Sequence, residues 1–76
     1  MTKDLQVGSR VVYHPVGHAP RTSVGKITRI ITHPEEVGSR HAMVRASEDE
    51  PRYVIENEHT HKEAAYKPGN IVQVLM

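Results

Sequence analysis

The chain has 76 residues, which is enough for one small domain, because a chain of this length buries only roughly 60% of its unfolded surface on folding. Ten basic and nine acidic residues leave a net charge of +1, so bulk electrostatics does not indicate a nucleic-acid or membrane binder. The absence of cysteine excludes disulfides, cysteine-based zinc sites and cysteine nucleophiles. Valine and isoleucine far outnumber leucine, and phenylalanine and tryptophan are missing, which favours β structure over helix.

No stretch approaches the ~18 apolar residues of a membrane span, and the first residues contain no apolar signal-peptide core. We therefore expect one cytoplasmic domain over residues 1–76, with a monomer as the default state and no membrane or nucleic-acid partner.

The first half of the chain predicts two strands separated by a loop. Residues 7–13 alternate with period two, which is typical of a strand. Residues 14–21 contain two prolines and one glycine and predict a loop. Residues 24–32 form a β-branched run whose apolar positions change phase between Ile27 and Ile30, so a bulge or strong bend is expected there.

The middle of the chain predicts a turn over residues 34–39, a third strand over 40–46 and an acidic turn over 47–51. Ser47 and Glu50 have the spacing of a capping box, but Pro51 prevents more than one helical turn. A fourth strand follows over residues 52–57.

The last third leaves two alternatives open. Thr60 and Glu63, which precede two alanines, suit the start of a short helix, whereas residues 59–61 suit a hairpin tip. We prefer a hairpin into residues 62–67, because Pro68 would leave such a helix under two turns long. A turn over 68–70 and a strand over 71–75 complete the chain.

Five or six short antiparallel strands separated by turns predict an all-β fold in which the sheet closes into a small barrel and so removes its exposed edges. Seven aliphatic side chains are expected in the core: Val11, Val24, Ile27, Val44, Ile55, Ile71 and Val74.

Several segments carry a resemblance to a known family. Residues 45–56, followed by Ala65-Tyr66-Lys67-Pro68, resemble the signature of the hypervirulence-associated protein family with its Tudor-type domain. Val7-Gly8-x-x-Val11-x-Tyr13 and Gly25-Lys26-Ile27 stand where that family has its first two strands. The resemblance covers nearly the whole chain, but Tyr13 replaces the tryptophan that is common at this position of the family.

The resemblance implies an SH3-like or Tudor-like barrel that stands alone as a protein. It implies a binding protein rather than an enzyme, with NADPH as its ligand and a link to virulence-related metabolism. The resemblance does not identify any residue of this chain as a binding residue.

Our own interpretation of the residues places the NADPH phosphates on cationic side chains and the base near a tyrosine, because guanidinium and ammonium groups bind phosphate. The candidate residues are Arg40, Arg45, Arg52, Tyr53, Tyr66 and Lys67. The alternative is an ordinary charged strand surface, in which Glu48, Asp49 and Glu50 pair with these cations.

Other kinds of site have weaker support. His59 and His61 would share one ion only in an extended strand, and spacing specifies no third ligand, so no metal site is predicted. No Gly-x-Ser-x-Gly motif is present, and no catalytic residue is predicted. Three tyrosines are too few for a methyl-lysine cage whose rings do not also fill the core. The alternative function is a Tudor-like interaction module with an unnamed protein partner.

Overall fold

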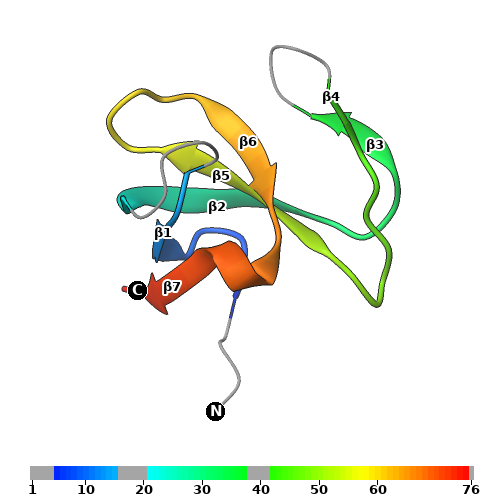
Figure 1. Cartoon of the computed structure of the whole chain (residues 1–76), viewed down its shortest axis with the longest axis horizontal. Coiled ribbons are helices and arrows are strands. Elements are labelled where there is room, and N and C mark those ends of the chain that lie inside the picture. Colours follow the sequence, from blue (N-terminus) through cyan, green and yellow to red (C-terminus); the bar gives the residue numbers. More distant parts are fainter. Residues whose placement is uncertain (1–4, 16–20, 38–41, 76) are drawn as a thin grey trace.

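The computed structural model describes residues 5–15, 21–37 and 42–75, and in this part of the chain every regular element except one short turn is a β-strand (Figure 1). The elements are β1 (Arg10–Tyr13), β2 (Ser23–Ile31), β3 (Glu35–Val37), β4 (Ala42–Val44), β5 (Arg52–Asn57), β6 (Glu63–Tyr66), the 3-10 turn η1 (Pro68–Asn70) and β7 (Ile71–Val74). No helix in these ranges is long and apolar enough to cross a membrane.

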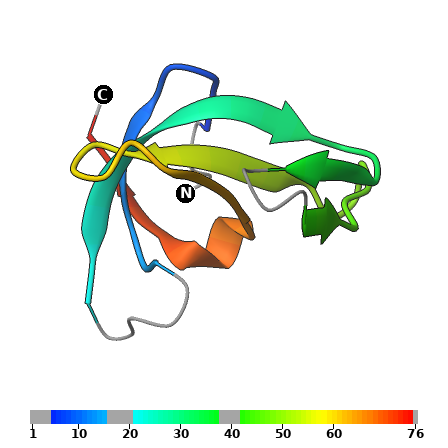
Figure 2. The ribbon, with the colours of Figure 1, turned by 90° about the horizontal axis from the view of Figure 1, so that it is seen from above.

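Five strands form one antiparallel sheet in the order β6-β5-β2-β1-β7, and β3 pairs with β4 in a separate hairpin. The predicted all-β antiparallel fold is confirmed. Figures 1 and 2 show the β3–β4 hairpin at the far end of β2 from β1 and β7. The sheet has β6 and β7 as its two end strands, and η1 connects them.

Several predicted boundaries change. The stretch 34–39, predicted as a turn, contains β3, which pairs Glu35 with Val44 and Val37 with Ala42. Three residues between a proline and a glycine carry too little periodicity to predict a strand, and this one exists because β4 pairs with it. The predicted strand 40–46 is reduced to β4, while Arg40 and His41 lie outside the described residues. The preferred hairpin, with its tip at residues 59–61 and its second strand in residues 62–67, is confirmed by the β5–β6 pairing.

The bulge predicted in β2 is confirmed. Ile27 pairs with Ile55 and Arg29 pairs with Val54, so that Thr28 has no partner in the register. One extra residue reverses the alternation of side chains between the two faces of a strand. As a result Ile27 and Ile31, four residues apart, point into different hydrophobic clusters.

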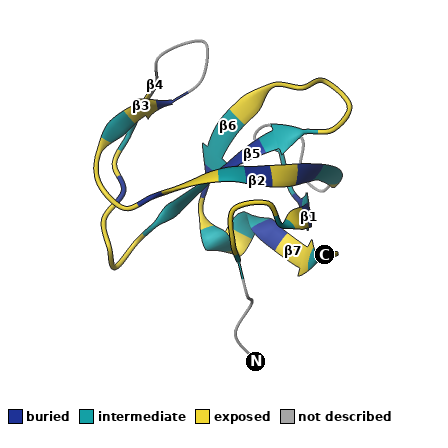
Figure 3. Ribbon diagram, turned by 180° about the vertical axis from the view of Figure 1, so that it is seen from behind, coloured by how far each residue is buried: buried dark blue, intermediate teal, exposed yellow. Residues whose placement is uncertain are grey.

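The core consists of two clusters on opposite faces of β2 and β5. The first contains Val11, Tyr13, Ile27, Ile55, Tyr66 and Ile71. The second contains Ile31, Val37, Ala46 and Val54 under the β3–β4 hairpin. Figure 3 shows these buried positions along β2 and β5. Adjacent strand residues point to opposite faces. Because each face of β5 is covered by one cluster, Val54 and Ile55 are both buried.

Four of the seven predicted core residues, namely Val11, Ile27, Ile55 and Ile71, are buried. Val74 packs half-buried on the first cluster and Val44 on the second, whereas Val24 is half-buried without joining either one. The alternation of residues along the chain did not predict that Val54 is buried, because its burial depends on the β3–β4 hairpin.

Close contact between β2 and β5 requires a glycine at position 25. A Cβ atom at Gly25 would lie 2.5 Å from Cγ2 of Ile55 and 2.7 Å from the carbonyl oxygen of Glu56. Contacts this short do not occur between packed atoms, so the residue that opens the second strand of the family resemblance is needed for packing. Ile55 thus packs directly against the backbone of β2 at Gly25.

We expect Ile55→Ala to unfold most of the protein at room temperature. Ile55 is 1% exposed, and truncation of a buried isoleucine costs about 2 to 5 kcal/mol, which is comparable to the roughly 3 to 5 kcal/mol that so small a core supplies. Ile30→Ala is the matched control, because Ile30 is 38% exposed. Urea denaturation followed by circular dichroism measures both, and equal midpoints for the two variants would contradict this core.

Candidate functional site

The first candidate site is an open pocket between the acidic turn and η1, which we call the Arg52–Lys67 pocket. Its volume is about 380 Å³. Two cations, two carboxylates and the apolar surface of two prolines line it: Asp49, Glu50, Pro51, Arg52, Lys67, Pro68, Gly69 and Asn70.

Strand pairing brings the two cations together. Tyr53 of β5 lies opposite Tyr66 of β6, and one step further along each strand the chain reaches Arg52 and Lys67. Both tyrosines pack in or against the first cluster. Successive residues of an extended chain point to opposite faces, so the two neighbouring cations lie on the other side. Arg52 and Lys67, fifteen positions apart, thus line one pocket.

Hydrogen bonds within the acidic turn hold one wall of this pocket. The backbone amide of Ser47 donates to the carbonyl oxygen of Glu50 at 3.1 Å, and the amide of Glu50 donates to the Ser47 hydroxyl at 3.1 Å. Nη1 of Arg52 donates to the same Glu50 carbonyl at 3.1 Å. The predicted acidic turn is confirmed, and it positions the guanidinium through a backbone carbonyl.

The other predicted site residues do not line this pocket. Arg45 is exposed just after β4, and Arg40 lies outside the described residues. Tyr66 is 8% exposed, and its ring centroid lies 5.0 Å from that of Tyr13 at an interplanar angle of 60°. Tyr53 packs half-buried against the same cluster. The structure therefore brings together Arg52 and Lys67 and places both tyrosines in the core packing.

A second candidate site lies at the other end of β5, between the β5–β6 hairpin on one side and Pro15 with residues 21–23 on the other. Two adjoining hollows of about 360 and 320 Å³ share Pro15, Asn57 and Thr60, and together we call them the hairpin groove. The first hollow adds Arg21, Thr22 and Ser23. The second adds Tyr13, Lys62, Glu63, Ala64 and Tyr66. Sequence reasoning missed this groove, since it is formed by segments that are about 40 residues apart.

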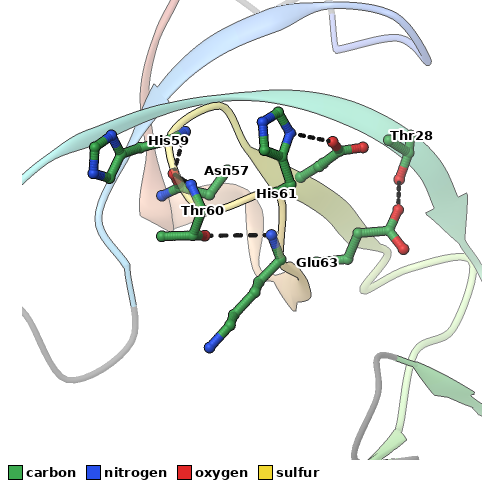
Figure 4. A network of polar contacts seen from close by, with 8 residues as sticks. Thr28, Asn57, His59, Thr60, His61 and Glu63 are labelled. Atoms are coloured by element: carbon green, nitrogen blue, oxygen red, sulfur yellow. Dashed lines mark hydrogen bonds and ion pairs between the residues drawn. The ribbon is translucent and has the colours of Figure 1, made fainter.

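Asn57 shapes one wall of the hairpin groove. Its Oδ1 accepts hydrogen bonds from the backbone amides of His59 at 2.8 Å and Thr60 at 3.1 Å, as Figure 4 shows. Its Nδ2 donates to the hydroxyl of Tyr13 at 2.9 Å. Burial raises the pKa of that phenol above its ordinary value. The signal for this arrangement was an asparagine followed by polar turn residues, which is typical of an Asx-turn.

The two histidines of the hairpin tip do not have the geometry assumed for a shared ion. His59 and His61 lie in the turn between β5 and β6 rather than in an extended strand, and His61 has a φ of 61°. Nδ1 of His61 lies 3.2 Å from Oε2 of Glu56, and Figure 4 shows the His59 ring on the other side of the tip. The described ranges contain no group of three or more side chains that could hold a metal ion.

One exposed ion pair connects the hairpin tip to β1. Nε and Nη2 of Arg10 donate to the two carboxylate oxygens of Glu58 at 2.5 and 2.9 Å. The hydrogen bond from Arg10 lowers the pKa of Glu58 below its ordinary value of 4.5, and the charge of Arg10 acts in the same direction. A lowered carboxyl pKa in the folded state means that acid favours unfolding, because the unfolded chain binds the proton more readily.

We therefore expect part of the acid sensitivity of this protein to come from Glu58. The stabilising contribution is fully present above pH 4.5 and is lost as the pH falls through the lower pKa of the folded state. Thermal melts between pH 6 and pH 3 should show a shallower decline for Glu58→Gln than for the parent. The matched control, Glu48→Gln, should follow the parent curve, and a parent-like decline in Glu58→Gln would assign the acid sensitivity to other groups.

Comparisons with known proteins agree with this architecture. Residues 8–71 match the family described as hypervirulence associated proteins TUDOR domain. The putative primary metabolism protein prl65 of Schizosaccharomyces pombe is 38% identical over 77 residues, which cover 99% of this chain and 98% of the relative. No solved structure matches the chain. The family match spans both candidate sites and most of the core, and the chain therefore belongs to the family of hypervirulence associated proteins with a TUDOR domain.

Proposed function

We propose that this protein is a non-enzymatic binding module that binds NADPH at the Arg52–Lys67 pocket in the cytoplasm. Membership of the family supports a small binding or interaction module. The observation that carries the proposal is that Arg52 and Lys67, from the ends of two different strands, line one pocket of about 380 Å³. This volume lies within the range of about 300 to 1,000 Å³ that is usual for small-molecule sites.

The chemistry of the pocket suits a phosphorylated nucleotide. The guanidinium of Arg52 offers paired donors for phosphate oxygens, and the ammonium of Lys67 adds a second positive charge. The guanidinium of Arg52 donates to a backbone carbonyl, and among the residues that the structure describes it forms no ion pair with a carboxylate, so its charge is available to a ligand.

The remaining walls suit the other parts of the ligand. The carboxylates of Asp49 and Glu50 accept hydrogen bonds from ribose hydroxyls, and Pro51 and Pro68 offer an apolar surface to a flat base. These prolines take the place of Tyr53 and Tyr66, whose rings pack in the core. A stacking tyrosine is thus not needed for the proposal.

The relative supports a metabolic role for the module. The Schizosaccharomyces pombe protein is described as a putative primary metabolism protein, and NADPH is the reductant of biosynthetic metabolism. We propose that binding senses or buffers NADPH and that this links the protein to virulence-related metabolic regulation.

We expect NADPH to bind more tightly than NADH, because only NADPH carries the 2′-phosphate. Arg52→Ala and Lys67→Ala should each weaken NADPH binding by about 1.5 kcal/mol, or roughly tenfold, at the lower end for charged hydrogen bonds because the pocket is open to solvent. Added salt should weaken binding further, since it screens exposed charges. Isothermal titration calorimetry measures all of these affinities.

Two controls keep this test specific. Lys26→Ala removes an exposed cation from the middle of β2, outside both candidate sites, and should leave the affinity unchanged. The NADPH affinity of Arg45→Ala shows whether the site extends to the end of β4. Equal affinity for NADPH and NADH, or unchanged binding in both Arg52→Ala and Lys67→Ala, would reject this site.

A further inference from the structure

We propose that the hairpin groove is a second binding site, and that its ligand is an extended acidic peptide segment of a partner protein. This inference goes beyond NADPH binding and does not rest on it, because the two sites lie at opposite ends of β5 and share no lining residue. It follows from the charges, the rigidity and the shape of the groove.

The described residues that line the groove carry more positive than negative charge. Arg21 lines one hollow and Lys62 lines the other, and within the described ranges neither side chain forms an ion pair. Among the described residues of the lining the one carboxylate is that of Glu63, whose Oε2 accepts a hydrogen bond from the Thr28 hydroxyl at 2.7 Å. Two cations without partners, one in each hollow, attract a ligand with acidic groups.

The carboxylates nearest to the groove along the chain are already engaged. Glu58 binds Arg10 through both oxygens, and Glu56 contacts the ring of His61. Neither of these carboxylates forms an ion pair with Arg21 or Lys62. In the Arg52–Lys67 pocket, by contrast, two carboxylates accompany the two cations.

The hairpin wall of the groove is held in place by hydrogen bonds of its own side chains. Asn57 holds the hairpin tip through the amides of His59 and Thr60 (Figure 4). Its Nδ2 also donates to the hydroxyl of the buried Tyr13. On the other wall, Nδ1 of His14 lies 3.0 Å from the carbonyl oxygen of Arg21. A preformed site loses less conformational entropy on binding and therefore binds more tightly.

The shape of the groove suits an extended chain better than a compact small molecule. A small-molecule pocket encloses most of its ligand, whereas here two shallow hollows adjoin along Pro15, Asn57 and Thr60. The half-buried Pro15 and Ala64 give the groove an apolar surface, and peptide-binding domains use such surfaces for apolar side chains between polar contacts. A methylated lysine is a poor occupant, because Arg21 and Lys62 repel it.

The test uses two fluorescein-labelled octapeptides, one of alternating glutamate and leucine and one of alternating lysine and leucine. Fluorescence anisotropy should show binding of the acidic peptide alone. The double variant Arg21→Ala/Lys62→Ala should bind it at least tenfold more weakly, the conservative variant Arg21→Lys/Lys62→Arg should retain binding, and the matched control Lys26→Ala should equal the parent. All the changed residues are exposed, and circular dichroism verifies that each variant is folded.

The position of the bound peptide is read from amide chemical shifts. The peptide should move the signals of Thr22, Ser23, Asn57 and Thr60 and leave those of Asp49, Glu50 and Arg52 in place. Three results would overturn the proposal: no binding of the acidic peptide, equal binding by the parent and the double alanine variant, or competition of NADPH for the peptide, which would make the groove the nucleotide site. Loss of NADPH binding in Arg52→Ala with intact peptide binding would separate the two sites.

Discussion

The bulge at Thr28 is the local feature on which the rest of this structure depends. A regular β2 strand would direct Ile27 and Ile31 to the same face, and only one hydrophobic layer would form. Because Thr28 is left without a partner between the pairs Ile27–Ile55 and Arg29–Val54, the two isoleucines serve opposite layers. A chain with little apolar material thus uses both faces of β2 and β5.

The two layers explain where the candidate sites lie. The first layer takes the buried rings of Tyr13 and Tyr66, and these two residues also lie behind the hairpin groove. The second layer is covered by the β3–β4 hairpin, which an ion pair between Arg29 and Glu35 joins to β2. Sites are left at the two ends of β5, where strands give way to turns and side chains of different segments meet. Binding residues in general concentrate on connections supported by a rigid scaffold.

The nearly neutral composition conceals a difference between these two ends. At the Arg52 end, cations and carboxylates are present in equal number, which suits a ligand with both acceptors and donors. At the Asn57 end, carboxylates are engaged by Arg10, Thr28 and the ring of His61, and Arg21 and Lys62 are left without partners among the described residues. A net charge of +1 does not distinguish these arrangements, because it averages over all pairings.

Local physics allowed the sequence to determine much of this fold. Alternation predicted β1, β5 and β7, the phase change between Ile27 and Ile30 predicted the bulge, and Pro68 favoured the β5–β6 hairpin over a helix. Each of these features depends on neighbouring residues alone. The strand β3, the burial of Val54, the meeting of Arg52 with Lys67 and the whole hairpin groove were decided by tertiary structure. They depend on which distant segments pair and which surfaces cover one another, and no short-range pattern specifies that.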